Sequence, residues 1–173
     1  LFSSLLGPPC SPRLFPYPLL FRSLAMVLEH DRPLVLDADA LNLLAGEPVA
    51  VPHAVLTPHP GEAARLLGIS TRAIHADRFA AAAALHERYR GVVVLKGAGT
   101  IVADDGVPSV IGAGNPGMGS GGMGDVLTGV IAGLLAQGAT PGEAARFGAC
   151  VHAVAGDRAA LAGERGLLAG ALM

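Results

Sequence analysis

The sequence is poor in charge, cysteine and lysine, and each shortage excludes a class of protein. Charged residues make up 15% of the 173 residues and the net charge is −2, so the chain lacks the basic surface that binds nucleic acid. Two cysteines, Cys10 and Cys150, provide neither a Cys-x-x-Cys metal pattern nor a disulfide framework, which suits a reducing cytosol. Lys96 is the single lysine, and the glycine spacing of a P-loop does not precede it.

Apolar residues are plentiful, at 51% of the chain, so the sequence excludes disorder of the low-hydropathy, high-charge kind. A chain of this length is long enough for one domain with a core and short for two. Residues 1–24 are different, because five prolines interrupt every apolar stretch and exclude a membrane span or an orderly signal peptide. We predict a disordered segment at 1–24 and a single domain at 25–173. Because the chain begins with Leu1 rather than Met, we expect a fragment.

Strand and helix patterns alternate through the predicted domain. Short apolar runs predict strands at 34–36, 51–56 and 92–95, with a hairpin of strands 100–103 and 109–111. Helical patterns cover 62–67, 71–89, about 122–137, and a segment that Thr140 and Pro141 begin. This alternation predicts an α/β fold, with a mostly parallel sheet covered on both faces and ligands bound at the carboxyl ends of its strands.

The segment 114–129, GNPGMGSGGMGDVLTG, carries the strongest functional signal. Its glycines leave backbone amides open at the start of a helix, an arrangement that suits phosphate. Asp125 follows in the first turn of that helix. It is either a general base for a hydroxyl that receives a phosphoryl group, or a carboxylate that stabilises the helix dipole; the spacing favours neither. Two matches to the dinucleotide fingerprint in this segment are weak, because so many glycines produce them readily.

Polar residues also follow three of the predicted strands. Lys96 begins the sequence KGAGT, where it could meet a nucleotide phosphate or be solvated in a turn between two strands. His59 lies between two prolines and could contact a ligand, although a surface histidine in a turn is commoner. Asp37 and Asp39 could hold Mg²⁺ through water or cap the next helix; we favour capping for Asp39 and leave Asp37 open. We predict no metal site made of side chains alone.

Four motifs together resemble one family. They are VLDADALNLLA (35–45), LTPHPGEAARLLG (56–68), VVVLKGAGTIV (92–102) and GNPGMGSGGMGDVLTGVIAGLLAQG (114–138). In this order and spacing they resemble the NAD(P)H-hydrate dehydratase domain. The resemblance implies a ribokinase-like α/β/α sandwich and a hydro-lyase, located in the cytoplasm, that repairs a damaged metabolite. Such enzymes dehydrate the S epimer of hydrated NADH or NADPH, using ADP in bacteria or ATP in eukaryotes; the motifs here are similar to the bacterial type.

The resemblance also assigns roles to residues. His59 and Asp125 would contact the hydrated nicotinamide nucleotide, and Asp125 would be the catalytic base. The expected nucleotide site comprises Lys96, Gly97, Ala98, Gly99, Thr100, Gly121, Gly122 and Gly124. Mg²⁺ would bridge the nucleotide phosphates. The resemblance further implies a homo-oligomer, a tetramer in the family, and an epimerase domain that can be fused upstream.

The sequence departs from the family pattern at both ends. At the C-terminus, GLLAGALM (166–173) stands where the family usually has Ala-Ser-Asp before its last helix. The family has further strands before the LDADALN motif, and residues 1–24 do not resemble them, so we expect an N-terminally truncated and incomplete domain. Two alternatives stay open: a ribokinase-like kinase acting on a vitamin-precursor alcohol, and an inactive fragment.

Overall fold

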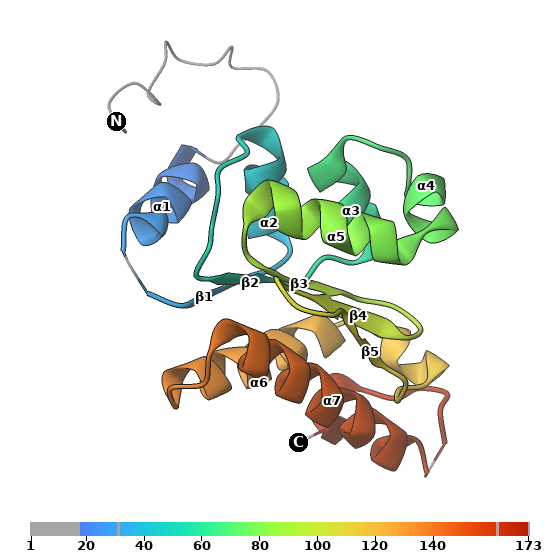
Figure 1. Cartoon of the computed structure of the whole chain (residues 1–173). Helices are drawn as coiled ribbons and strands as arrows, with labels where there is room; N and C mark the ends of the chain where they lie inside the picture. Colours follow the sequence, from blue (N-terminus) through green and yellow to red (C-terminus); the bar gives the residue numbers. More distant parts are fainter. Residues whose placement is uncertain (1–17, 31, 162, 173) are drawn as a thin grey trace. The chain divides into compact units, whose positions relative to one another are not determined.

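The computed structural model describes residues 18–30, 32–161 and 163–172 (Figure 1). The chain divides into two units, residues 1–30 and 31–173. In the first unit, α1 (Pro18–Leu28) begins at a proline, which the first helical position tolerates. Residues 18–24 are therefore helical, against our expectation of disorder, while residues 1–17 lie outside the described part. None of the helices in the described ranges is long and apolar enough to cross a lipid bilayer.

The second unit is built around one sheet of five strands. In spatial order these are β1 (Leu34–Leu36), β2 (Ala54–Leu56), β3 (Val92–Leu95), β4 (Thr100–Ala103) and β5 (Ser109–Ile111). β1, β2 and β3 pair in parallel, while β4 pairs antiparallel with both of its neighbours. Four strands therefore run in one direction and only β4 opposes them, which agrees with the predicted mostly parallel sheet. The predicted hairpin is present as β4 and β5.

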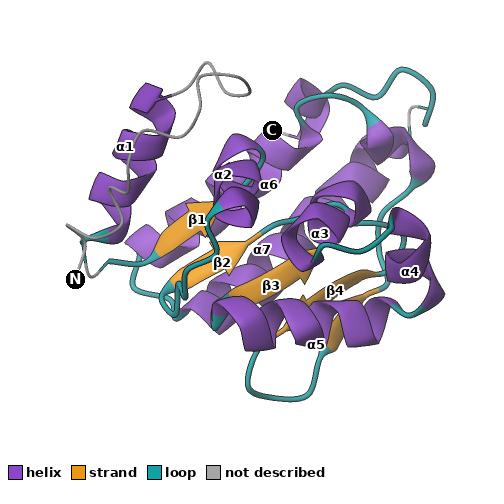
Figure 2. Cartoon of the chain, turned by 90° about the horizontal axis from the view of Figure 1, so that it is seen from above, coloured by secondary structure: helices purple, strands orange, loops and turns teal. Residues whose placement is uncertain are grey.

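Helices cover both faces of this sheet (Figures 1 and 2). On one face lie α2 (Asp39–Gly46), α3 (Pro60–Leu67), α4 (Thr71–Ala76) and α5 (Arg78–Tyr89); on the other lie α6 (Met123–Ala136) and α7 (Pro141–Ala160). Two short 3-10 turns, Pro116–Gly119 and Ala169–Leu172, complete the elements described. The core beneath α6 and α7 contains Val55, Val94, Leu127, Ile131 and Ala149. This three-layer arrangement confirms the predicted α/β fold.

The packing of α6 on α7 depends on small side chains. Gly148 of α7 is buried, and a Cβ added there would lie 2.7 Å from Cγ1 of Ile131, which is fully buried on α6. Gly133 of α6 faces open space, with nothing within 4 Å of an added Cβ. The two helices therefore approach closely at Gly148, whereas Gly133 is exposed and faces away from other atoms.

The single long helix predicted over 71–89 is wrong, because the structure has two helices that meet at Asp77. The backbone of Asp77 is extended, with φ −147° and ψ 92°, so it cannot continue α4. Its side chain instead caps α5 by accepting a hydrogen bond of 2.9 Å from the N–H of Ala80. Aspartate favours this position because its carboxylate satisfies an amide that has no partner within the helix.

The structure confirms the predicted start of α7 at Thr140 and Pro141. Thr140 forms a capping box with Glu143 at the start of α7, and Gly68 ends α3 in the left-handed conformation. The capping predicted for Asp39 is wrong. Ala38 occupies the N-cap of α2 with φ 48°, without a side-chain hydrogen bond, and Asp39 lies inside the first turn.

Candidate functional site

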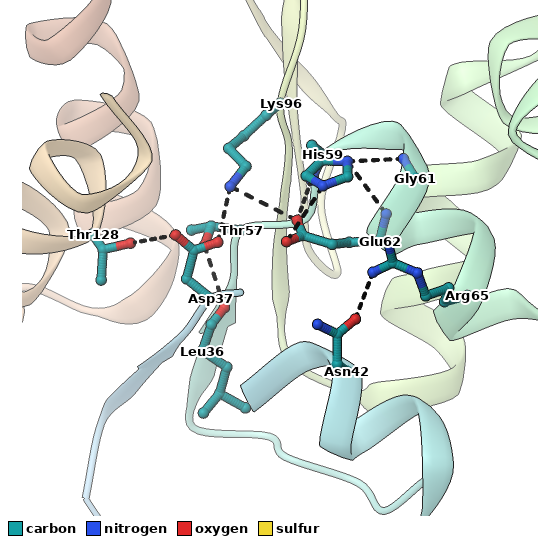
Figure 3. Close-up of polar contacts among 10 residues, drawn as sticks. All are labelled: Leu36, Asp37, Asn42, Thr57, His59, Gly61, Glu62, Arg65, Lys96 and Thr128. Carbon is teal, nitrogen blue, oxygen red and sulfur yellow. Dashed lines mark hydrogen bonds and ion pairs between the residues drawn. The ribbon is translucent and has the colours of Figure 1, made fainter. Parts of the chain in front are cut away.

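The carboxyl ends of β1, β2 and β3 bring three polar residues into one cluster (Figure 3). Asp37, Thr57 and Lys96 each follow one of these strands directly. Since parallel strands end at the same edge of a sheet, these residues meet although up to 59 positions separate them. Nζ of Lys96 donates a hydrogen bond of 2.8 Å to Oδ1 of Asp37. The location confirms that polar groups gather where an open α/β sheet binds ligands.

Asp37 also connects this edge to α6. Its Oδ2 accepts a hydrogen bond of 3.1 Å from the hydroxyl of Thr128. Burial alone would raise the pKa of Asp37, but hydrogen bonds from Lys96 and Thr57, with the charge of Lys96, outweigh it and lower the pKa. The carboxylate is therefore ionised at neutral pH, with both oxygens engaged. Asp37 therefore binds Lys96 and Thr128 within the site, and Ala38, not Asp37, occupies the N-cap of α2.

Lys96 lies between two carboxylates. Besides Asp37, Oε2 of Glu62 approaches its Nζ to 3.8 Å, and the Glu62 side chain is only 8% exposed. The Lys96 side chain itself is 22% exposed, so the alternative of a solvated lysine is wrong. A phosphate that reached this ammonium would meet a cation already held in place by its neighbours. Contact between Lys96 and a nucleotide stays a prediction.

His59 is held by the first turn of α3 and remains half exposed. Its Nδ1 accepts hydrogen bonds from the N–H groups of Gly61, at 2.9 Å, and Glu62, at 3.4 Å. In return, Oε2 of Glu62 accepts a bond of 2.7 Å from the His59 N–H. Because Nδ1 is an acceptor, the proton of the neutral imidazole lies on Nε2, which is 3.5 Å from Oε1 of Glu62. Glu62 therefore touches both His59 and Lys96, two residues assigned to different ligands by resemblance.

The glycine-rich segment brings the start of α6 against the Asp37–Lys96 pair. A Cβ added at Gly124 would lie 3.4 Å from Oδ2 of Asp37 and 3.5 Å from Nζ of Lys96. Gly122 is the N-cap of α6, with φ 85°, a conformation that glycine adopts without strain. Gly121 is exposed and has open space around it. The amides at this helix start therefore lie beside the only lysine of the chain, and anions favour such a position.

Asp125 lies in the first turn of α6, next to Gly124, and its side chain is exposed. Within the described ranges its carboxylate makes no hydrogen bond or ion pair, in contrast to Asp37. An exposed, unpaired carboxylate next to an anion site is free to accept a proton from a bound ligand. Asp125 thus directly follows the glycine that lies beside the Asp37–Lys96 pair, and its catalytic role stays a prediction.

The predicted turn after β3 is present and is held by a side chain that the sequence analysis missed. Gly97 and Gly99 have φ values of 141° and 64°, and the Thr100 hydroxyl donates to the Gly97 carbonyl at 3.1 Å. Arg78, at the start of α5, donates to the carbonyls of Ala98, Leu95 and Lys96, the last two at 3.1 Å and 3.4 Å. The guanidinium therefore fixes the backbone of the predicted nucleotide loop. No sequence pattern pairs Arg78 with a loop about 20 residues away.

The beginning of the glycine-rich segment is anchored to α7. Asp157 accepts hydrogen bonds from the Gly114 N–H, at 2.9 Å, and from the Asn115 side chain, at 3.0 Å. These bonds lower the pKa of Asp157. Further along, Ser120 donates to the Leu167 carbonyl at 2.8 Å. Contacts with α7 and with the C-terminal segment therefore shape a loop that contains too many glycines to hold its own conformation.

Comparisons with known proteins agree with this geometry. The sequence model of one family, described as NAD(P)H-hydrate dehydratase, matches residues 18–173. The bifunctional NAD(P)H-hydrate repair enzyme of Coxiella burnetii is 56% identical over 145 residues, which cover 83% of this chain and 30% of that protein. The ADP-dependent (S)-NAD(P)H-hydrate dehydratase of Neisseria meningitidis is 44% identical over 140 residues, covering 76% of this chain and 47% of that protein. The chain therefore spans less than half the length of these two relatives.

Solved structures show the same relationship. An ADP/ATP-dependent NAD(P)H-hydrate dehydratase from Bacillus subtilis, co-crystallised with ATP and Mg²⁺, superposes with a TM-score of 0.77 at 31% identity, covering 87% of this chain and 55% of that one. A ribokinase-like superfamily protein from Enterococcus faecalis gives a TM-score of 0.80 at 28% identity, covering 94% of this chain and 58% of that one. The expected ribokinase-like fold is confirmed. By sequence motif, fold and family match together, the chain belongs to the NAD(P)H-hydrate dehydratase family.

Proposed function

We propose that the chain dehydrates the S epimer of hydrated NADH or NADPH, using ADP or ATP as phosphoryl donor. One observation carries the proposal: Gly124 packs against the Asp37–Lys96 pair, while the carboxylate of the next residue, Asp125, is exposed and has no partner among the described residues. A phosphate-binding helix start and a free base therefore lie one residue apart. The family membership and the ATP-bound relative support ADP or ATP as the donor.

Asp125 would act as the base for phosphoryl transfer. It accepts the proton of the C6 hydroxyl while that oxygen attacks the terminal phosphorus, and the bond from this phosphorus to the nucleotide breaks. The phosphate of the resulting ester is a better leaving group than hydroxide. Cleavage of the C6–O bond, with loss of a proton from C5, then restores the dihydropyridine ring and releases inorganic phosphate. His59, half exposed with its proton on Nε2, would donate a hydrogen bond to the hydrated nucleotide.

The start of α6 and Lys96 would stabilise the charge that moves during transfer. The amides of residues 121–124 and the positive end of the helix dipole favour the phosphoryl oxygens, and the Lys96 ammonium lies beside them. In the described ranges, no group of three or more His, Cys, Asp and Glu residues could hold a metal ion. Mg²⁺ would therefore be held mainly by the phosphates of the nucleotide, and it would neutralise their charge.

The first test follows the recovery of NADH absorbance from (S)-hydrated NADH with Mg²⁺, supplying ADP and ATP separately. Recovery with either nucleotide supports the proposal and identifies the donor. Recovery with neither, from a folded chain, contradicts it. The vitamin-precursor kinase alternative predicts instead that the chain phosphorylates alcohol substrates and leaves the hydrated nucleotide unchanged.

A substitution then tests the base. Asp125→Asn keeps the shape and hydrogen-bonding capacity of the side chain but cannot take up the proton, so we expect turnover to fall by about 10²–10⁴-fold, the range of general acid–base catalysis. Nucleotide binding, measured by calorimetry, should persist. Asp105→Asn is the matched control, because it changes an exposed aspartate in the β4–β5 hairpin, and it should retain full activity. Full activity of Asp125→Asn would refute the assignment.

The resemblance also supports three proposals about the whole protein. It would act in the cytoplasm, assemble as a homo-oligomer up to a tetramer, and work together with an epimerase activity. The bifunctional relatives support the last of these. Light scattering coupled to size-exclusion chromatography tests the oligomeric state.

A further inference from the structure

We propose that Asp37 is a positioning residue, which fixes Lys96 and the first two turns of α6 relative to one another. The inference rests on the proposed function, since it concerns the same phosphate-binding site. Asp37 has two carboxylate oxygens, and each binds a different element: Oδ1 accepts from Lys96 after β3, at 2.8 Å, and Oδ2 accepts from Thr128 on α6, at 3.1 Å. No other side chain in Figure 3 joins α6 to the strand ends.

The surroundings of Asp37 require it to stay in place. Its side chain is 12% exposed, so an ionised carboxylate is kept away from most of the water that would otherwise solvate it. A carboxylate in this position is costly unless its partners are well placed, and here both oxygens have partners. Gly124 lies directly over the Asp37–Lys96 pair, since a Cβ added at this glycine would lie only 3.4 Å from Oδ2 of Asp37. A larger residue or a shifted helix would therefore disturb Asp37.

A negative charge beside a phosphate site opposes binding, so simple attraction does not account for Asp37. Coulomb repulsion predicts that removing the charge leaves nucleotide affinity unchanged or increases it. If Asp37 acts by positioning, its removal should instead lower the rate of turnover. Without Asp37, Lys96 and the α6 amides no longer share one fixed geometry, and misplacement by about 1 Å can cost roughly 100-fold in rate. Removing Asp37 should therefore lower turnover without lowering nucleotide affinity. A general structural defect would lower both.

Lys96 provides a direct reporter, because it is the single lysine of the chain. Selective ¹⁵N labelling of lysine gives one side-chain Nζ resonance, whose proton exchange reports whether the ammonium is held. In Asp37→Asn we expect about tenfold faster exchange, since a charge-assisted hydrogen bond becomes a neutral one. We expect unchanged or tighter ADP binding and about 100-fold lower turnover. Asp104→Asn is the matched control, because it breaks an ion pair with Arg146 at the opposite end of β3 and β4. It should leave Nζ exchange, ADP binding and turnover unchanged.

A second variant keeps the test decisive if Asp37→Asn does not fold. Thr128→Val replaces the hydroxyl that binds Oδ2 of Asp37 with a methyl group, so turnover should fall while ADP binding is retained. Thr128→Ser keeps a hydroxyl and should retain the parent turnover. Unchanged Nζ exchange in Asp37→Asn, or loss of ADP affinity in parallel with turnover, would overturn the inference. If the parent chain neither binds ADP nor turns over the hydrated nucleotide, the proposed function fails, while the Nζ resonance still decides whether Asp37 holds Lys96.

Discussion

His152 on α7 shows how burial determines the chemistry of a single side chain. Its Nε2 is buried without a hydrogen-bond partner among the described residues. Burial lowers the pKa of His152, a hydrogen bond with the backbone of Met123 partly opposes this, and the charge of Lys96 adds to the lowering. The imidazole is therefore neutral at pH 7. It adds no positive charge behind the start of α6.

A pH dependence follows from this shift. The unfolded chain takes up a proton on His152 near pH 6.5, whereas the folded chain resists it to a lower pH. In that window the unfolded state binds more protons, so the free energy of unfolding should fall as pH falls below about 6.5. His152→Gln cannot titrate and should lose less stability between pH 7 and pH 5 in urea denaturation. His75→Gln, which changes an exposed side chain on α4, is the control and should keep the parent curve; identical curves for His152→Gln and the parent would contradict the prediction.

Among the elements, α6 and α7 connect the candidate site to the core, because α6 carries site residues in its first turns and packs against α7 further along. α6 bears Gly124, Asp125 and Thr128 in its first two turns, and Ile131 one turn later packs against Gly148 of α7. A shift of α7 at Gly148 would therefore move the helix that carries the site residues. The close approach requires glycine, since a Cβ would meet the buried Ile131 side chain.

Two glycine substitutions test this packing in opposite directions. Gly148→Ala places a methyl group 2.7 Å from Ile131, and we expect overpacking to lower the free energy of unfolding by about 1–3 kcal/mol. Gly133→Ala adds the same group in open space within α6, and should raise the free energy of unfolding by about 0.5–1 kcal/mol through helix propensity. Urea denaturation measures both. Equal effects from the two substitutions would refute the packing argument.

Considered as a whole molecule, the 31–173 unit forms its site from segments distributed along most of its length. The cluster takes Asp37 from the end of β1, Lys96 from the end of β3 and Thr128 from α6. A ligand bound there contacts the folded arrangement and has no equivalent site in the unfolded chain. Ligand binding and global stability must therefore be linked.

ADP should accordingly stabilise the folded chain. At 100 times its dissociation constant, ADP raises the free energy of unfolding by about 2.7 kcal/mol, so the melting temperature should increase with ADP concentration. Thermal unfolding followed by circular dichroism measures this. Lys96→Met removes the ammonium beside Gly124 and should reduce the shift at a given ADP concentration. A melting temperature independent of ADP would contradict nucleotide binding by this chain.

The sequence determined the elements whose signals are local. Apolar runs placed β1 and β3, the Thr140–Pro141 pair placed the start of α7, and two short apolar runs on either side of residues 104–106 placed the hairpin, because each depends on neighbouring residues alone. The order of the motifs identified the family, and with it the candidate residues from His59 to Asp125. The helical pattern failed at Asp77, since the alanine-rich residues on both sides favour a helix and the break shows only in the extended backbone of Asp77.

Tertiary structure alone decided which residues meet. Asp37 and Thr128 are 91 positions apart, and Arg78 reaches carbonyls 17 to 20 positions away, distances that no periodic pattern encodes. Sheet order brings the strand ends to one edge, and the packing of α6 on that sheet then lays Gly124 over the Asp37–Lys96 pair. Residue type and local pattern thus determined what each segment can do chemically. The burial of apolar faces in three layers determined which of those segments act together.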